Sequence, residues 1–190
     1  MTTPQRRKEV HVHGTLFLAK GVEIVHIEEA LKPWLDYCEL KHITELKSIE
    51  QQEPGVAWDP RERTLELCWT GEIGRSFGAR LSESLDALGP MTEYASEIEV
   101  TWYHENGEDD LGLMFVGPTA DAIQEVRRQC ANEDVDAALS RYLGRDEVDQ
   151  VLSLVNDLFQ RDWEKRGSNT TEEPSAAGTS PAPRNRRHLH

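Results

Sequence analysis

The sequence predicts an α+β fold: an antiparallel-rich sheet followed by C-terminal helices and a disordered tail. Between residues 10 and 116, stretches with a hydrophobic period of two residues alternate with stretches of helical period. An Asn-Gly pair, Asn106-Gly107, separates two strand-like stretches, and this dipeptide is typical of tight antiparallel hairpins. From residue 119 the period is helical only, and residues 167–190 are rich in Ser, Thr, Pro, Ala and Gly.

The first strand is predicted over residues 10–18, where four apolar residues alternate with four others. The two sets are Val10, Val12, Leu16 and Leu18, and His11, His13, Thr15 and Phe17. Gly14 interrupts the pattern and indicates a bulge. A helix is expected over residues 27–40, with Pro33 either in its first turn or at a kink, because proline lacks the amide hydrogen that a helix interior needs.

Two strands and a helix follow in the middle of the chain. Residues 55–58 and 63–70 are predicted as strands around a turn at Asp59-Pro60, since proline suits the second position of a type I turn. Residues 41–53 show no clear period. Residues 75–88 have a helical apolar stripe that ends before a Gly-Pro pair, which is a helix stop signal.

The hairpin around Asn106-Gly107 is the sharpest local prediction. Both central residues of the favoured turn need positive φ, and a two-residue turn fixes the register of its strands. The predicted cross-strand pairs are Trp102 with Leu111, Val100 with Leu113, Ile98 with Phe115, and His104 with Asp109. The first three pairs would place apolar residues on one face of the sheet.

Two helices are predicted at the C-terminal end, over residues 119–143 and 146–165. The apolar stripe of the first helix changes phase near Asn132, which predicts a break there. The first six predicted elements have the order β-α-β-β-α-β, which matches the ferredoxin-like split βαβ arrangement. That arrangement hosts many unrelated functions, so the order predicts no activity.

Charge is divided unevenly along the chain, whose formal net charge is −14. Residues 9–166, expected to form a single α+β domain, contain 33 acidic against 15 basic residues, hence −18. The basic clusters lie in residues 1–8, expected to be a flexible N-terminus, and in the tail, at Arg184, Arg186 and Arg187. An anionic body repels phosphate and anionic lipid, so direct nucleic-acid binding by that body is not expected.

Several protein classes are disfavoured by what the sequence lacks. No apolar run approaches the roughly 18 residues of a membrane span, and the polar, basic start does not resemble a secretory leader. Three widely spaced cysteines without a CxxC pair predict free thiols rather than a disulfide framework. We therefore expect a cytoplasmic protein with no membrane partner and no cofactor.

One constellation indicates metal chemistry. His11 and His13 lie two residues apart on a predicted strand, so both rings project from the same face. A third ligand would have to come from elsewhere, and His104 with Asp109 is the candidate pair. The sequence thus leaves open a metal-binding protein or metal-dependent enzyme that uses these histidines.

No catalytic motif is present, and the balance of charge favours a small acidic interaction or regulatory protein without catalytic activity. Its partner would be a protein with a basic surface. In a narrower version, its carboxylates imitate a nucleic-acid backbone and inhibit a nucleic-acid-binding partner. A further alternative is a nucleic-acid-binding module that acts through the basic tails. Trp163 is a candidate anchor for a partner, and the C-terminal helices offer a surface for a homodimer.

Overall fold

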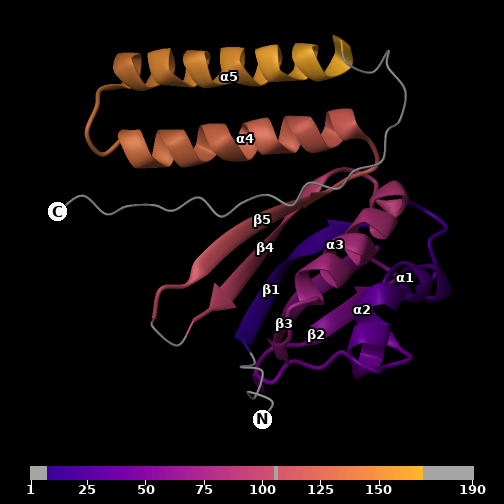
Figure 1. Cartoon of the computed structure of the whole chain (residues 1–190). Helices are drawn as coiled ribbons and strands as arrows, with labels where there is room; N and C mark the ends of the chain where they lie inside the picture. The colour runs from indigo at the N-terminus through magenta and orange to yellow at the C-terminus, as the bar shows by residue number, and fades with distance from the viewer. Residues whose placement is uncertain (1–7, 105–106, 169–190) are drawn as a thin grey trace.

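The structure is a computed structural model that describes residues 8–104 and 107–168. In that part of the chain a five-stranded sheet has the order β2-β3-β1-β4-β5, and every pair of neighbours is antiparallel (Figure 1). The strands are β1 (Lys8–Phe17), β2 (Gly55–Asp59), β3 (Thr64–Ile73), β4 (Ser96–Tyr103) and β5 (Asp110–Val116). The α+β prediction is confirmed, and β2-β3-β1-β4 is the strand order of the split βαβ arrangement.

The helices form two separate groups. The helices of the first group, which cover one face of the sheet, are α1 (Ile24–Ala30), α2 (Lys32–Tyr37) and α3 (Phe77–Leu88). Two short 3₁₀ helices, η1 (Ile43–Glu45) and η2 (Gly89–Met91), lie in the connections. The second group is a hairpin of α4 (Ala120–Leu139) and α5 (Arg145–Ser168), which stands apart from α1, α2 and α3 beside β5 (Figure 1).

The predicted helix over residues 27–40 is in fact two short helices that meet at Leu31. Pro33 lies in the first turn of the second helix. Proline has no amide hydrogen and its ring collides with the carbonyl of the residue four positions earlier. A new helix therefore begins at Lys32 instead of continuing the first one.

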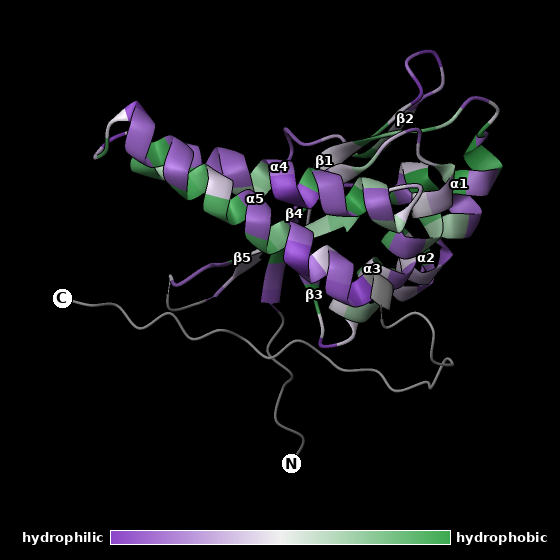
Figure 2. Cartoon of the chain, turned by 90° about the horizontal axis from the view of Figure 1, so that it is seen from above, coloured by the Kyte–Doolittle hydropathy of each residue, from purple (hydrophilic) through white to green (hydrophobic). Residues whose placement is uncertain are grey.

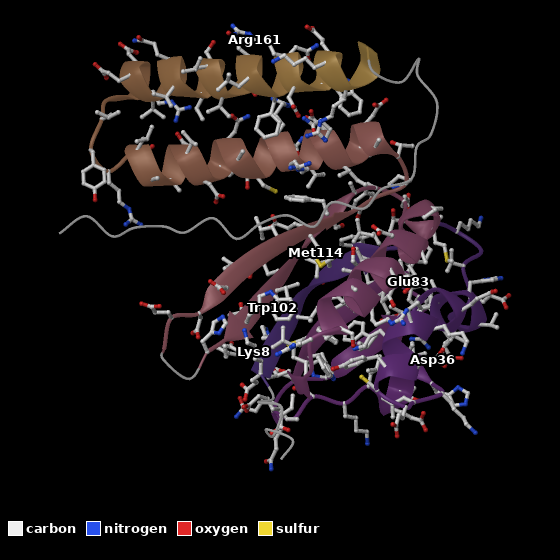
Figure 3. The ribbon with its side chains drawn as sticks, viewed as in Figure 1. Lys8, Asp36, Glu83, Trp102, Met114 and Arg161 are labelled. Carbon is white, nitrogen blue, oxygen red and sulfur yellow. The ribbon has the colours of Figure 1, made fainter. Side chains whose placement is uncertain are left out.

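The face of the sheet under α1, α2 and α3, the covered face, is the hydrophobic core. Its fully or almost fully buried hydrophobic residues on the three central strands are Val10, Val12, Leu16, Leu65, Leu67, Trp69, Ile73, Ile98 and Val100. Trp102 on β4 and Met114 on β5 pack against the same core on the α3 side (Figure 3). An aromatic group stacks at the centre, where the Phe77 ring lies 5.6 Å from the Trp69 ring.

Two glycines on the covered face let bulky neighbours approach. A Cβ atom on Gly71 would lie 2.3 Å from the Trp69 indole, and one on Gly14 would lie 2.5 Å from Cδ1 of Ile98. The predicted bulge at Gly14 is wrong, because the pairing of β1 with β3 runs through this residue without an extra one. Gly14 is explained by this close packing instead.

The predicted register of the β4–β5 hairpin is wrong by one residue. Trp102 lies opposite Asp110 rather than Leu111, and Ile98 lies opposite Met114. A shift of one residue exchanges the two faces of a strand. The leucines of β5 therefore point to the face opposite the core.

The shift has a packing reason. Phe115 turns to the face that α4 approaches, where the Arg127 guanidinium lies 5.7 Å above its ring. Apolar residues thus occur on both faces of β5, so the apolar pattern agreed with the register that a two-residue turn predicts although that register is wrong. Asn106, on which the turn prediction depended, lies outside the described residues.

The predicted break near Asn132 does not occur, because α4 is continuous. One side of α4 faces the sheet, where the Cys130 thiol contacts the Glu97 carboxylate at 3.0 Å. Arg128 and Asn132 point instead to α5 and both donate hydrogen bonds to the Asn156 side-chain oxygen. Residues 127–132 therefore contact two partners, the sheet and α5, from two sides of one continuous helix.

The chain ends are described only in part. Lys8 belongs to β1, and α5 reaches Ser168. The rest of the predicted flexible N-terminus and disordered tail lies outside the described residues, as do Arg184, Arg186 and Arg187.

Candidate functional site

The second face of the sheet, which we call the open face, presents charged and metal-ligating side chains instead of the hydrophobic core. It consists of the residues that alternate with the buried ones on all five strands. Its carboxylates are Glu9 on β1, Asp59 on β2, Glu66 and Glu72 on β3, and Glu97 and Glu99 on β4. No strand residue that points to this face is a lysine or an arginine in the described chain. The open face is therefore strongly anionic.

A cluster of metal-ligating side chains lies near the middle of the open face. His11 and His13 project from β1 with their rings stacked at 5.8 Å, and Cys68 on β3 lies directly opposite His13. One ligand atom from each of the three residues lies within 4.8 Å of the others. Two imidazoles and a thiol at this spacing are the donor set that suits a zinc ion.

Glu53 joins this cluster from the loop that precedes β2. Its Oε1 atom lies 3.3 Å from Nδ1 of His11, and its Oε2 atom accepts hydrogen bonds from the hydroxyls of Ser48 and Thr70. The loop is held in place by the Ile49 amide, which donates to the Thr70 carbonyl at 2.9 Å. The carboxylate is thereby fixed over β1 and β3.

These contacts determine which nitrogen of His11 carries the proton. Nδ1 lies 2.9 Å from the Thr70 hydroxyl oxygen, and that hydroxyl already gives its hydrogen to Glu53. An ionised carboxylate can only accept a hydrogen bond. Nδ1 therefore donates to the Thr70 hydroxyl, with the Glu53 carboxylate beside it, and in the neutral ring Nε2 keeps its lone pair.

The pKa values of Glu53 and Cys68 are shifted in opposite directions. Burial alone would raise the pKa of Glu53, but the hydrogen bonds from Ser48 and Thr70 and the nearby imidazoles hold this pKa below its usual value. Burial raises the pKa of the Cys68 thiol, and the negative charges of Glu53 and Glu66 raise it further. When no cation is bound, the cluster thus contains an ionised Glu53 carboxylate beside a protonated Cys68 thiol.

A hollow of 760 Å³ lies beside the cluster on the open face. It is lined by Glu9, Glu50 and Glu53, by Tyr103, and by Ile49, Gln51, Gln52 and Thr70. Burial raises the pKa of the Tyr103 hydroxyl, and the carboxylates of Asp109, Glu9, Glu53 and Glu50 raise it further. The carboxylates Glu9, Glu50 and Glu53 therefore place several negative charges at one hollow.

The structure does not bring His104 and Asp109 together with His11 and His13 as a described group of ligands. His104 pairs with Asp110, whose carboxylate lies 2.8 Å from its Nε2 atom. Asp109 accepts a hydrogen bond from the His104 backbone amide instead of lying opposite it in the sheet. Of the four predicted ligands, only the two on β1 share a cluster.

Sequence reasoning missed Cys68 and Glu53. Along residues 63–70 Cys68 alternates with Leu65, Leu67 and Trp69, which places it on the outward face, and the split βαβ order makes the first and third strands neighbours. Those two signals together would have placed Cys68 beside the histidines. Glu53 carried no signal, because it lies in a loop without a period.

The α4–α5 hairpin offers a second surface, of a different kind. Among its residues with described side chains, only Val148 is buried. Leu154 and Leu158 are 54% and 53% exposed, and Trp163 is half-buried. Hydrophilic and hydrophobic residues are interspersed along both helices (Figure 2). Partner binding through Trp163 and dimerisation through these helices stay predictions.

Comparison with known proteins places the chain in a family. A family model described as "Family of unknown function (DUF6806)" matches residues 8–160. The chain belongs to this family. The match covers the whole sheet, α4 and most of α5, so the open face and the helical hairpin are both parts of the DUF6806 unit. No curated protein and no solved structure matches the chain.

Two further findings concern the cysteines and the helices of this DUF6806 chain. Cys38, Cys68 and Cys130 are free thiols. Among the residues that the structure describes, no helix has both the length and the apolar character needed to cross a bilayer.

Proposed function

We propose that this DUF6806 protein is a non-catalytic binding protein whose open face holds a partner protein by its basic surface. The observation that carries the proposal is the acidic hollow, where Glu9, Glu50 and Glu53 line one cavity on a face whose described strands present no lysine or arginine. Such a cavity favours the entry of a lysine or arginine side chain, because a cation there gains several nearby negative charges.

The border of the same face favours a protein over other cationic ligands. Leu111 and Leu113 on β5 are 65% and 42% exposed on the open face, and the Phe17 and Tyr94 rings pack 4.9 Å apart beside it. Protein interfaces combine apolar and aromatic contacts with a polar, charged surround. The proposal places this pairing in the cytoplasm, where reducing conditions suit the free thiols. Imitation of a nucleic-acid backbone stays a narrower prediction.

The test compares two variants of equal net charge. The open-face variant carries Glu9→Gln, Glu50→Gln and Glu99→Gln. The control carries Glu29→Gln, Glu83→Gln and Asp86→Asn, which neutralise exposed carboxylates on α1 and α3 (Glu83 is labelled in Figure 3). The probe is a fluorescent oligo-lysine peptide, whose binding to the full-length chain is measured by anisotropy at low salt.

We expect the open-face variant to bind the peptide about tenfold more weakly than the control, because three pair interactions of up to ~1 kcal/mol each are lost. Capture from cell lysate with the same two variants then identifies the natural partner, which the control retains at low salt and the open-face variant does not. Equal affinities of the two variants for the peptide would refute the proposed surface.

A further inference from the structure

We propose that His11, His13 and Cys68 bind one Zn²⁺ ion on the open face, with Glu53 positioning His11 from behind and the fourth coordination position left for water or a donor atom of a partner. This proposal does not require the proposed basic partner, because its three ligands do not line the hollow, which shares only Glu53 and Thr70 with the zinc site.

The first support is geometric. Zinc sites have ligand–metal distances of about 2.0–2.3 Å, so tetrahedral ligands lie roughly 3–4 Å apart. The ligand atoms of the three residues already lie within 4.8 Å of one another, so small side-chain rotations would close the site. The backbone of β1 and β3 is fixed by the sheet ladder, which holds His13 and Cys68 directly opposite each other.

The second support is the outer shell around His11. Histidines that bind metals generally donate their other ring nitrogen to a carboxylate or carbonyl, which orients the ring and raises its basicity. Nδ1 of His11 already faces Glu53 and Thr70, so Nε2 is the nitrogen with the free lone pair. Glu53 is itself oriented by two hydroxyls, and its side chain is only 19% exposed.

The third support is the surrounding field. Glu66 and Glu99 flank the cluster on the open face, Glu66 two residues before Cys68 and Glu99 directly opposite His13. With Glu53 they provide negative charge around a site that would gain two positive charges. Such surroundings raise the local concentration of a divalent cation and favour its retention.

The test uses untagged full-length protein, stripped with a chelator and then titrated with Co²⁺ as a spectroscopic substitute for Zn²⁺. We expect one ion per chain, a near-ultraviolet charge-transfer band from the Cys68 thiolate, and displacement of Co²⁺ by Zn²⁺. The band disappears in Cys68→Ser and persists in Cys38→Ser and Cys130→Ser. Glu53→Gln keeps the stoichiometry but weakens affinity about 10- to 100-fold, as loss of an outer-shell carboxylate does elsewhere.

A second control addresses the histidines of the C-terminal segment. The variant His188→Ala with His190→Ala should keep the full band, because the proposed ligands lie in the sheet. Zn²⁺ should also raise the melting temperature of the wild-type chain, and it should raise that of Cys68→Ser much less. No stoichiometric Co²⁺ or Zn²⁺ binding to the wild-type chain, or a band that survives Cys68→Ser, would overturn the zinc site. Neither result depends on whether oligo-lysine binds.

Discussion

The covered face and the open face belong to the same strands but were selected by different requirements. On β3, Leu67 is fully buried against α1, α2 and α3, and the next residue, Cys68, points outward to two histidines. The covered face consists of residues that fill volume. The open face carries carboxylates, imidazoles and a thiol, which contribute little packing, and its apolar residues are concentrated on β5. The difference indicates that stability is concentrated on one face and binding on the other.

The neighbouring pair on β3 gives the largest expected contrast. Leu67→Ala should lower the free energy of unfolding by about 2–5 kcal/mol, because it removes buried methyl groups and leaves a cavity. Cys68→Ala should lower it by about 1 kcal/mol or less in the metal-free protein, since its side chain is only partly buried. Urea unfolding of both variants measures this difference. Equal losses would remove the distinction between the faces.

A substitution at Gly71 tests how tightly the covered face is packed. Gly71→Ala should cost about 1–3 kcal/mol, because the added Cβ would meet the Trp69 indole and a packed core resists extra volume. Tryptophan fluorescence should shift along with the unfolding midpoint, which reports movement of the indole. A variant as stable as wild type would show that the ring can relocate freely, contrary to the packing described.

Thr70 tests a buried polar residue of the open face. Thr70→Val keeps the shape of the side chain but removes its hydrogen bonds to His11 and Glu53, so it should cost about 1 kcal/mol of unfolding free energy. If zinc binds as proposed, the same variant should also weaken Zn²⁺ affinity. Thr64→Val, at the other end of β3, is the matched control and should change neither quantity appreciably.

The smallest expected effect concerns Cys130, and it is measured as the reactivity of the thiol rather than as stability. Burial raises the pKa of this thiol to about 12, with a further contribution from Glu97 at the end of the open face that α4 covers. Only the thiolate reacts, so alkylation of Cys130 should rise about tenfold per pH unit from pH 8 to pH 10. Glu97→Gln should accelerate the reaction at each pH. Mass spectrometry of labelled peptides reads both results, and a plateau near pH 9 would contradict the assigned environment.

The covered face could be predicted from sequence because burial leaves a periodic pattern. Val10 and Val12 alternate with His11 and His13, and Leu65 and Leu67 alternate with Glu66 and Cys68, which assigns all four apolar residues to the covered face. The predicted register of β5 is wrong because alternation reveals the buried face only where a single face is buried. On β5, Phe115 contacts α4 and Met114 packs against the core on the other face. The apparent break at Asn132 arose in the same way, because one helix packs on two partners.

Only half of the candidate site, His11 and His13, could be predicted from the sequence. Alternation placed His11 and His13 on one face, but their cross-strand partner depends on the register between β1 and β3, which are about fifty residues apart in the chain. Glu53 depends on the path of a loop held by hydrogen bonds from Ser48 and Ile49. Such contacts leave no periodic trace in a single sequence.

Chemical-shift mapping by NMR tests most directly whether the open face is the binding face. The isotopically labelled full-length chain would be titrated with oligo-lysine peptide in the absence of metal. The account predicts that the shifted amides lie in residues 9–15 of β1, 66–72 of β3 and 97–103 of β4, together with the loop around Glu50. Shifts confined to α5 around Leu154 and Leu158, with these strands unchanged, would contradict it.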